Sequence, residues 1–195
     1  MHRRIPRFTH ALLLVAALSL AAALPASATV LHYHASLSGS AEAPPNLSTA
    51  VGNAEVTIDD IAHTMRVQAS FIGLSGNTTA CHIHGPTAVA LTGTAGVATM
   101  TPAFTGFPIG VTSGNLDHTF DLTLGATYNS PFVTANGGTA ATAEIALLAM
   151  IAAGQAYFNI HSTVVPGGEI RGFLQVFNPT PTAKSTWARV KSLYY

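Results

Sequence analysis

The stretch CHIHG, from Cys81 to Gly85, contains two histidines separated by a single residue. Successive side chains of a β-strand point to opposite faces, so His82 and His84 would share one face while Cys81 and Ile83 point to the other. Two imidazoles spaced in this way can reach the same metal ion. The chemistry suggested by this stretch is therefore metal coordination.

A third histidine, His161, ends the stretch YFNIH. The same alternation directs Phe158 and Ile160 toward a core and His161 to the opposite face. Only the short turn from Ser162 to Gly168 separates this strand from the next one, which predicts an antiparallel hairpin. Facing positions then place Glu169 opposite His161, where its carboxylate can accept a hydrogen bond from one ring nitrogen and leave the other for a metal.

The hypothesis is a metal site with His82, His84 and His161 as nitrogen ligands. Three histidines suit copper or zinc better than calcium or magnesium, which prefer oxygen. The alternative is purely structural. Histidines on a half-exposed sheet can hydrogen-bond neighbouring carbonyl groups, and Glu169 with Arg171 can form a surface ion pair worth under about 1 kcal/mol.

Two further features leave alternatives open. His32 and His34 also alternate along a strand and form a second candidate pair. Cys81, the only cysteine, is most simply a small buried hydrophobe, but it becomes a candidate thiolate ligand if the two faces are reversed. The chain contains no G-x-S-x-G, H-E-x-x-H, P-loop or C-x-x-C motif, so hydrolysis is not supported.

Residues 1–28 have the three parts of a secretory signal: a basic start, an apolar run from Ala11 to Leu24, and a small-residue ending of the A-x-A kind. The apolar run has about 14 residues, whereas a membrane span needs roughly 20. We therefore expect cleavage after Ala28 and a secreted or periplasmic mature chain. No second apolar run is long enough to predict a membrane span.

The charge balance argues against nucleic acid as a partner. Three of the 8 Lys and Arg lie in the expected signal segment and none of the 8 Asp and Glu does, so the mature balance is 5 − 8 = −3. A weakly acidic chain lacks the basic surface that phosphate binding requires. The partner is left open as an unknown protein or a metal ligand.

Short strand-like runs separated by Gly, Pro, Asn and Ser predict an all-β fold. The predicted strands are His32–Ser38, Gly52–Ile58, Thr64–Phe71, Ala80–His84, Thr119–Leu124, Gln155–His161 and Glu169–Phe177. The segment Thr142–Ala153 lacks alternation and ends before Gly154, which predicts a short helix. We expect an antiparallel β-sandwich or a barrel-like Greek-key domain with one short helix at residues 29–177, then a loosely ordered tail at 178–195.

Five motifs, in order, resemble the CHRD domain, which is named after the extracellular protein chordin. They are ASLSGSAEAPPN (35–46), GNAEVTID (52–59), GLSGNTTACHIHG (73–85), LLAMIAAGQAYFNIHS (147–162) and PGGEIRGFLQ (166–175). The resemblance covers about Leu31 to Phe177 and implies an all-β secreted domain of the type found in bacteria. It aligns the family's H-I-H, N-x-H and G-E-I-R-G motifs with residues 82–84, 159–161 and 168–172.

Two functional hypotheses follow. The first is a secreted CHRD module without enzymatic activity that binds a partner or has a structural role and carries the histidine metal site. The second is a copper-dependent redox enzyme, because copper-zinc superoxide dismutase is also a secreted β-sandwich with an H-x-H copper strand and an arginine near the metal. His82, His84 and Arg171 would be the matching residues. The likeness stops there, since the sequence shows neither a loop with zinc ligands nor a cysteine pair.

Overall fold

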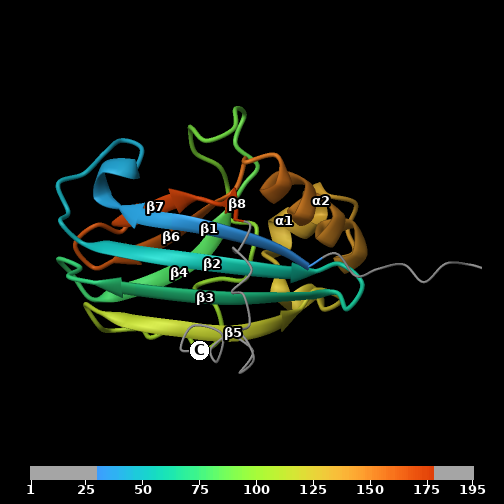
Figure 1. Ribbon diagram of the computed structural model, residues 1–195, viewed down its shortest axis with the longest axis horizontal. Helices are drawn as coiled ribbons and strands as arrows, with labels where there is room; N and C mark the ends of the chain where they lie inside the picture. Colours follow the sequence, from blue (N-terminus) through green and yellow to red (C-terminus); the bar gives the residue numbers. More distant parts are fainter. Residues whose placement is uncertain (1–29, 178–195) are drawn as a thin grey trace, which may run out of the picture.

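Eight strands form one curled antiparallel sheet in the computed structural model, which describes residues 30–177 (Figure 1). The strands are β1 (Val30–Ser38), β2 (Val51–Asp59), β3 (Thr64–Ile72), β4 (Thr78–His84), β5 (Gly114–Asp121), β6 (Tyr157–Ser162), β7 (Ile170–Phe173) and β8 (Gln175–Val176). Their order is β4-β6-β7-β1-β2-β3-β5, with β8 paired to β1. The all-β, barrel-like prediction is confirmed, and these strands do not divide into the two sheets of a sandwich. The expected signal segment and C-terminal tail lie outside the described residues.

Two predicted strands differ from those observed. Strand β5 begins five residues before the predicted start at Thr119. Only Leu116 and Phe120 of this strand are buried, so its sequence shows little alternation. The last predicted strand is divided into β7 and β8 at Leu174, whose side chain is buried and whose N–H donates to the carbonyl of Ala156 at 3.0 Å.

Two α-helices, α1 (Ser130–Ala135) and α2 (Ala140–Ala152), lie together at one end of the sheet (Figure 1). The side chain of Thr139 caps α2 by accepting the N–H of Thr142 at 3.2 Å. Helix α2 confirms the helix predicted at Thr142–Ala153. The sequence does not predict the six-residue α1, because so short a helix shows no periodicity. Within residues 30–177, no helix is both long and apolar enough to cross a membrane.

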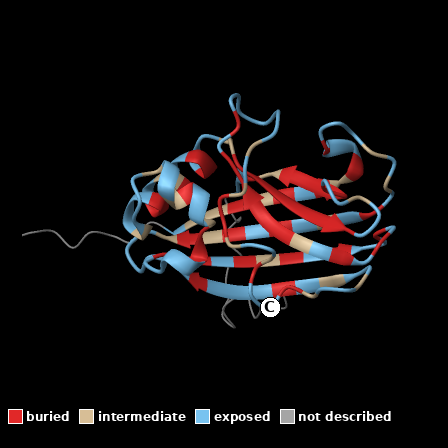
Figure 2. Cartoon of the chain, turned by 180° about the vertical axis from the view of Figure 1, so that it is seen from behind, coloured by how far each residue is buried: buried red, intermediate tan, exposed pale blue. Residues whose placement is uncertain are grey.

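The strands differ in how many of their faces are covered. In β3, four buried side chains alternate with more exposed ones, as expected for a sheet with one face in water. All six residues of β6 are buried, and β4 and β7 are nearly as enclosed. Figure 2 shows this contrast, because the lowest strand, β5, is mostly exposed and the strands at the top are mostly buried. Strands β4, β6 and β7 are thus covered on both faces.

The segment from Val97 to Val111 runs along the free edge of β4 and helps to close the curled sheet. Four of its N–H groups donate to carbonyl groups of β4, at distances from 2.9 to 3.4 Å. Phe104 in this segment is 2% exposed, and its ring centroid lies 5.9 Å from that of Phe158 on β6 and 5.1 Å from that of Phe120 on β5. A single aromatic side chain therefore joins the edge strand β5 to the opposite side of the sheet.

Replacing Phe104 with alanine should lower the free energy of unfolding by about 3–5 kcal/mol, because a large buried side chain is lost and a cavity remains. Urea denaturation followed by circular dichroism measures this change. Leu47→Ala is the control, since Leu47 is 99% exposed, and it should alter stability by less than about 0.5 kcal/mol. Equal stability of the two variants would show that Phe104 does not hold the sheet closed.

Candidate metal centre

Strand register brings the three predicted ligands together on the outer face of the sheet. Strands β4 and β6 are antiparallel neighbours, with His82 opposite Asn159 and Ala80 opposite His161. The ring centroid of His82 lies 4.7 Å from that of His161 and 4.7 Å from that of His84. One possible ligand atom from each ring lies within 4.8 Å of the other two. The distances allow a shared ion, and its coordination stays a prediction.

Hydrogen bonds to backbone carbonyl groups fix the orientation of two of the rings. Nδ1 of His84 lies 2.9 Å from the carbonyl oxygen of Ala95, and Nδ1 of His161 lies 2.9 Å from that of Pro166. A carbonyl oxygen can only accept, so each Nδ1 carries the hydrogen and each Nε2 keeps its lone pair. Metal-binding histidines are commonly held in this way.

Three ring nitrogens of the cluster are buried without a hydrogen-bond partner: Nδ1 of His82, Nε2 of His84 and Nε2 of His161. Buried polar atoms nearly always have a partner, and leaving one without a partner costs about 1–3 kcal/mol. Three such atoms in one cluster are the pattern expected where lone pairs converge on a ligand. This pattern is a stronger sign of a metal site than the spacing of the histidines in the sequence.

The three rings are uncharged at neutral pH. Burial, with a smaller effect of the two neighbouring histidines, lowers the pKa of His82 to about 3. Burial also lowers the pKa of His84 to about 4, although its hydrogen bond to Ala95 opposes the shift. The pKa of His161 is lowered by burial as well. Neutral imidazole is the form that binds a metal, so protons do not compete for these nitrogens at neutral pH.

The prediction that Glu169 orients His161 is wrong. One carboxylate oxygen of Glu169 accepts hydrogen bonds from the hydroxyl of Ser48 at 2.7 Å and from the N–H and hydroxyl of Ser75 at 2.6 and 2.9 Å. A fully buried carboxylate needs several donors, and two serines supply more than one imidazole can. The carbonyl of Pro166 instead takes the role that was predicted for the carboxylate.

The prediction of a surface ion pair between Arg171 and Glu169 is also wrong. Both side chains are buried, and Arg171 bonds to groups other than Glu169. Its guanidinium donates to the carbonyl oxygens of Ala41 at 2.6 Å and Gly93 at 3.0 Å. Its Nε lies 3.7 Å from a carboxylate oxygen of Glu42. One buried cation therefore ties two covering loops to strand β7.

Two residues of this face, Glu42 and Tyr157, are not identified as site residues by the sequence. Glu42 accepts a hydrogen bond from Asn159 at 2.6 Å, and burial raises its pKa although Asn159 and Arg171 act in the opposite direction. The ring of Tyr157 stacks on His84 at 4.7 Å and 6°, and the guanidinium of Arg171 lies 4.6 Å from the same ring. Only the CHRD-like motif AEAPPN marks Glu42, which is far from β6 in sequence.

The other candidate ligands lie elsewhere. Nδ1 of His32 lies 3.2 Å from the hydroxyl of Thr57, and the ring of His34 lies 6.3 Å from that of Phe177. Among residues 30–177, neither belongs to a group of three possible ligands. Cys81 is fully buried in the core, and burial raises the pKa of its thiol. The prediction that Cys81 faces the core is confirmed, and the thiolate alternative is wrong.

These features define an all-β domain with three clustered histidines on a covered strand face. Residues 33–174 match the family of the CHRD domain. The match covers more than half of the chain, so the protein belongs to the CHRD domain family. No curated protein and no solved structure matches the chain.

The metal-free protein should lose stability as the pH falls from 6.5, the ordinary histidine pKa, toward 4. In this range the unfolded chain takes up protons on His82 and His84 while the folded chain does not, so acid favours unfolding. Each of these histidines adds a slope of up to about 1.4 kcal/mol per pH unit. Urea denaturation at several pH values, with a chelator present, measures the slope.

The double variant His82→Gln/His84→Gln should show a shallower pH dependence, because two of the groups that titrate only on unfolding are gone. His118→Gln is the control, since His118 is exposed on β5. It should keep the wild-type slope. A wild-type slope in the double variant would contradict the neutral, buried state of the cluster.

Glu169→Ala should lower the free energy of unfolding by about 1.5–3 kcal/mol, because the donors of Ser48 and Ser75 lose a charged acceptor. Burial raises the pKa of Glu169, but hydrogen bonds from Ser162, Ser75 and Ser48 together lower it, so the carboxylate is charged at neutral pH. Chemical denaturation at neutral pH measures the loss. Glu55→Ala, an exposed carboxylate, should change stability by under about 0.5 kcal/mol. Similar losses of stability in both variants would show that the hydrogen bonds from Ser48 and Ser75 to Glu169 do not stabilise the fold.

Proposed function

We propose that this CHRD domain is a binding module without enzymatic activity, exported from the cell, that holds one copper or zinc ion on His82, His84 and His161. The group of three buried ring nitrogens without hydrogen-bond partners carries the proposal. Export rests on the signal-like composition of residues 1–28. The CHRD family membership supports a module rather than an enzyme.

The donor set suits a transition metal. Copper and zinc both bind neutral imidazole nitrogen, whereas calcium and magnesium take oxygen ligands. Copper(II) binds nitrogen sites more tightly than zinc in the Irving–Williams order, so copper should be preferred when both are present. The carbonyl groups of Ala95 and Pro166 would then act as outer partners that keep two Nε2 atoms directed at the ion.

The enclosure of the cluster favours binding over catalysis. The three histidines are only 5, 9 and 8% exposed in chain order, which leaves little surface for a substrate to reach the ion. Arg171, the counterpart of the dismutase arginine, is held by Ala41, Gly93 and Glu42. We therefore infer a structural or sequestering role for the ion, with the copper redox enzyme as the alternative that the experiment has to separate.

Purified protein should bind one copper(II) or zinc ion per chain, and the double variant His82→Ala/His84→Ala should bind it more than about 100-fold more weakly, since loss of outer partners alone costs 10–100-fold. Isothermal titration and elemental analysis measure binding, and electron paramagnetic resonance should show nitrogen ligands to copper. His32→Ala/His34→Ala is the matched control. It removes the same H-x-H pattern from β1 and should leave the affinity unchanged.

Equal loss of metal binding in both double variants, or no loss in either, would contradict the proposal that these histidines hold the ion. Circular dichroism of each variant separates loss of ligands from loss of the fold. The copper-loaded wild-type protein should not consume superoxide faster than the same amount of copper bound to a short peptide. Consumption that disappears in His82→Ala/His84→Ala would instead establish the redox enzyme.

A further inference from the structure

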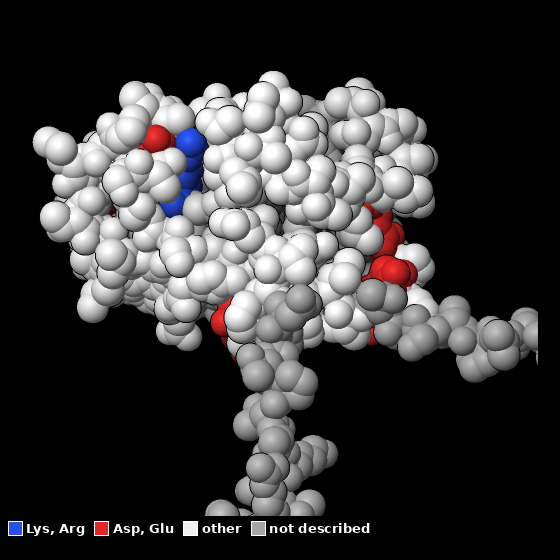
Figure 3. Space-filling model, turned by 45° about the horizontal axis from the view of Figure 1, so that its top comes forward, with Lys and Arg blue, Asp and Glu red and all other residues white. Residues whose placement is uncertain are grey.

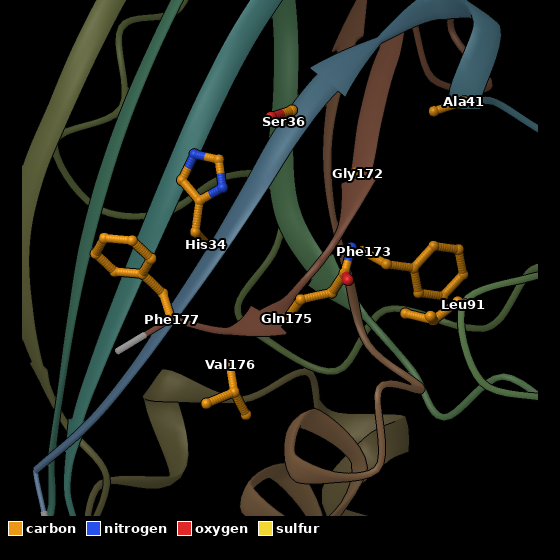
Figure 4. A pocket seen from close by; sticks show the side chains of 9 residues that line it. All are labelled: His34, Ser36, Ala41, Leu91, Gly172, Phe173, Gln175, Val176 and Phe177. Carbon is orange, nitrogen blue, oxygen red and sulfur yellow. The ribbon is translucent and has the colours of Figure 1, made fainter. Parts of the chain in front are cut away.

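A groove crosses the outer surface at the point where the chain leaves the described domain (Figure 4). Its central hollow has a volume of about 400 Å³ and is bounded by residues that include His34 on β1, Leu91 in the loop after β4, and Val176 on β8. A second hollow of about 240 Å³ shares Leu91 and Val176 and reaches the end of α2. A third, of about 300 Å³, shares Phe177 with the first and reaches Glu55 on β2.

The walls of this groove present apolar side chains to solvent. Leu91, Val176 and Phe177 are 52, 63 and 47% exposed, and all three line the central hollow. Leu91 has φ of 61°, in the left-handed region that an apolar residue seldom adopts. Exposed apolar side chains gathered in one hollow, unlike single scattered ones, indicate a surface that another segment covers.

The described domain is acidic, and the segment that follows it is basic. Residues 30–177 contain eight Asp or Glu and two Arg, a balance of 2 − 8 = −6. Residues 178–195 contain Lys184, Arg189 and Lys191 and no acidic residue, a balance of +3. Charged side chains are sparse over the face seen in Figure 3. Glu55 lines the third hollow together with Arg66, whose guanidinium is paired with Asp117 at 2.6 Å.

We propose that residues 178–195 fold back and occupy the groove, with Trp187 as the apolar anchor. The segment starts directly after Phe177, which is itself part of the wall. Trp187 follows at a separation of 187 − 177 = 10 residues, and an extended chain of that length spans up to roughly 33 Å. Arg189 and Lys191 then lie close to the anchor and can face the Glu55 end of the groove.

A second copy of the domain is a poorer occupant than the chain's own segment. Two domains that each carry −6 repel one another, whereas the basic segment is attracted to the acidic domain. Covalent attachment also gives the segment a high effective concentration at the groove, in the millimolar range for short flexible connections. The chain's own C-terminal segment therefore fits both the chemistry and the position of the groove.

Trp187 is the only tryptophan of the chain, so its fluorescence reports the docking directly. In the full chain we expect a blue-shifted emission maximum and acrylamide quenching severalfold weaker than that of N-acetyltryptophanamide. Val176→Asp and, independently, Leu91→Asp should raise the quenching constant severalfold. Ile72→Asp is the matched control, because Ile72 on β3 has the same 63% exposure as Val176 but lies outside the groove, and it should quench like the wild type.

Full quenching of Trp187 in the wild-type chain would overturn the proposal. So would protection that persists in both groove variants while circular dichroism shows them folded, because the tryptophan would then be bound elsewhere. Protection that appears only as the protein concentration rises, with dimers in sedimentation, would assign the groove to a second copy instead. No metal enters this measurement, so its outcome is independent of the histidine site.

Discussion

The structure depends on satisfying polar side chains that are buried on the outer face of β4, β6 and β7. Loops cover this face, so each polar atom there loses water and needs a partner inside the protein. Glu169 finds serine donors, Arg171 finds backbone carbonyl groups, and Asn159 finds Glu42. Three histidine nitrogens, one from each ring of the cluster, have no partner, and neither does the second carboxylate oxygen of Glu169, Oε2. The metal proposal therefore follows from the packing of this face, which an H-x-H pattern alone does not reveal.

The G-E-I-R-G motif is explained by the same packing. Gly168 has φ of 130°, and a Cβ there would lie 2.7 Å from Asn159 Oδ1 and 2.9 Å from Glu42 Oε1. A Cβ on Gly172 would collide with the carbonyl group of Ser36 on β1. Both glycines thus leave room for close approach, one by buried polar side chains and the other by a neighbouring strand. The three residues between them place a carboxylate, a core side chain and a guanidinium in succession.

The sequence predicted those features of the structure that depend on the two-residue alternation of a strand or on a short turn. Alternation placed Cys81 in the core and its neighbouring histidines on the opposite face, and the short turn before Glu169 predicted the β6–β7 hairpin. The sequence did not predict side-chain contacts that depend on a loop distant in the chain. Whether Glu169 bonds an imidazole or Ser48 depends on how the segment between β1 and β2 closes over the sheet, and no period encodes that closure. For the same reason, the sequence does not predict that Glu42 is buried and accepts a hydrogen bond from Asn159.

The loop after β4 connects the histidine cluster with the apolar groove. Its Ala95 carbonyl orients His84, its Gly93 carbonyl accepts from Arg171, and its Leu91 side chain forms a wall of the groove. An ion that fixed the ring of His84 would hold this loop more firmly through the Nδ1 hydrogen bond. Arg171 already anchors the loop without any ion. The part of the loop that carries Leu91 is therefore held through Gly93 and Arg171 whether or not an ion is bound.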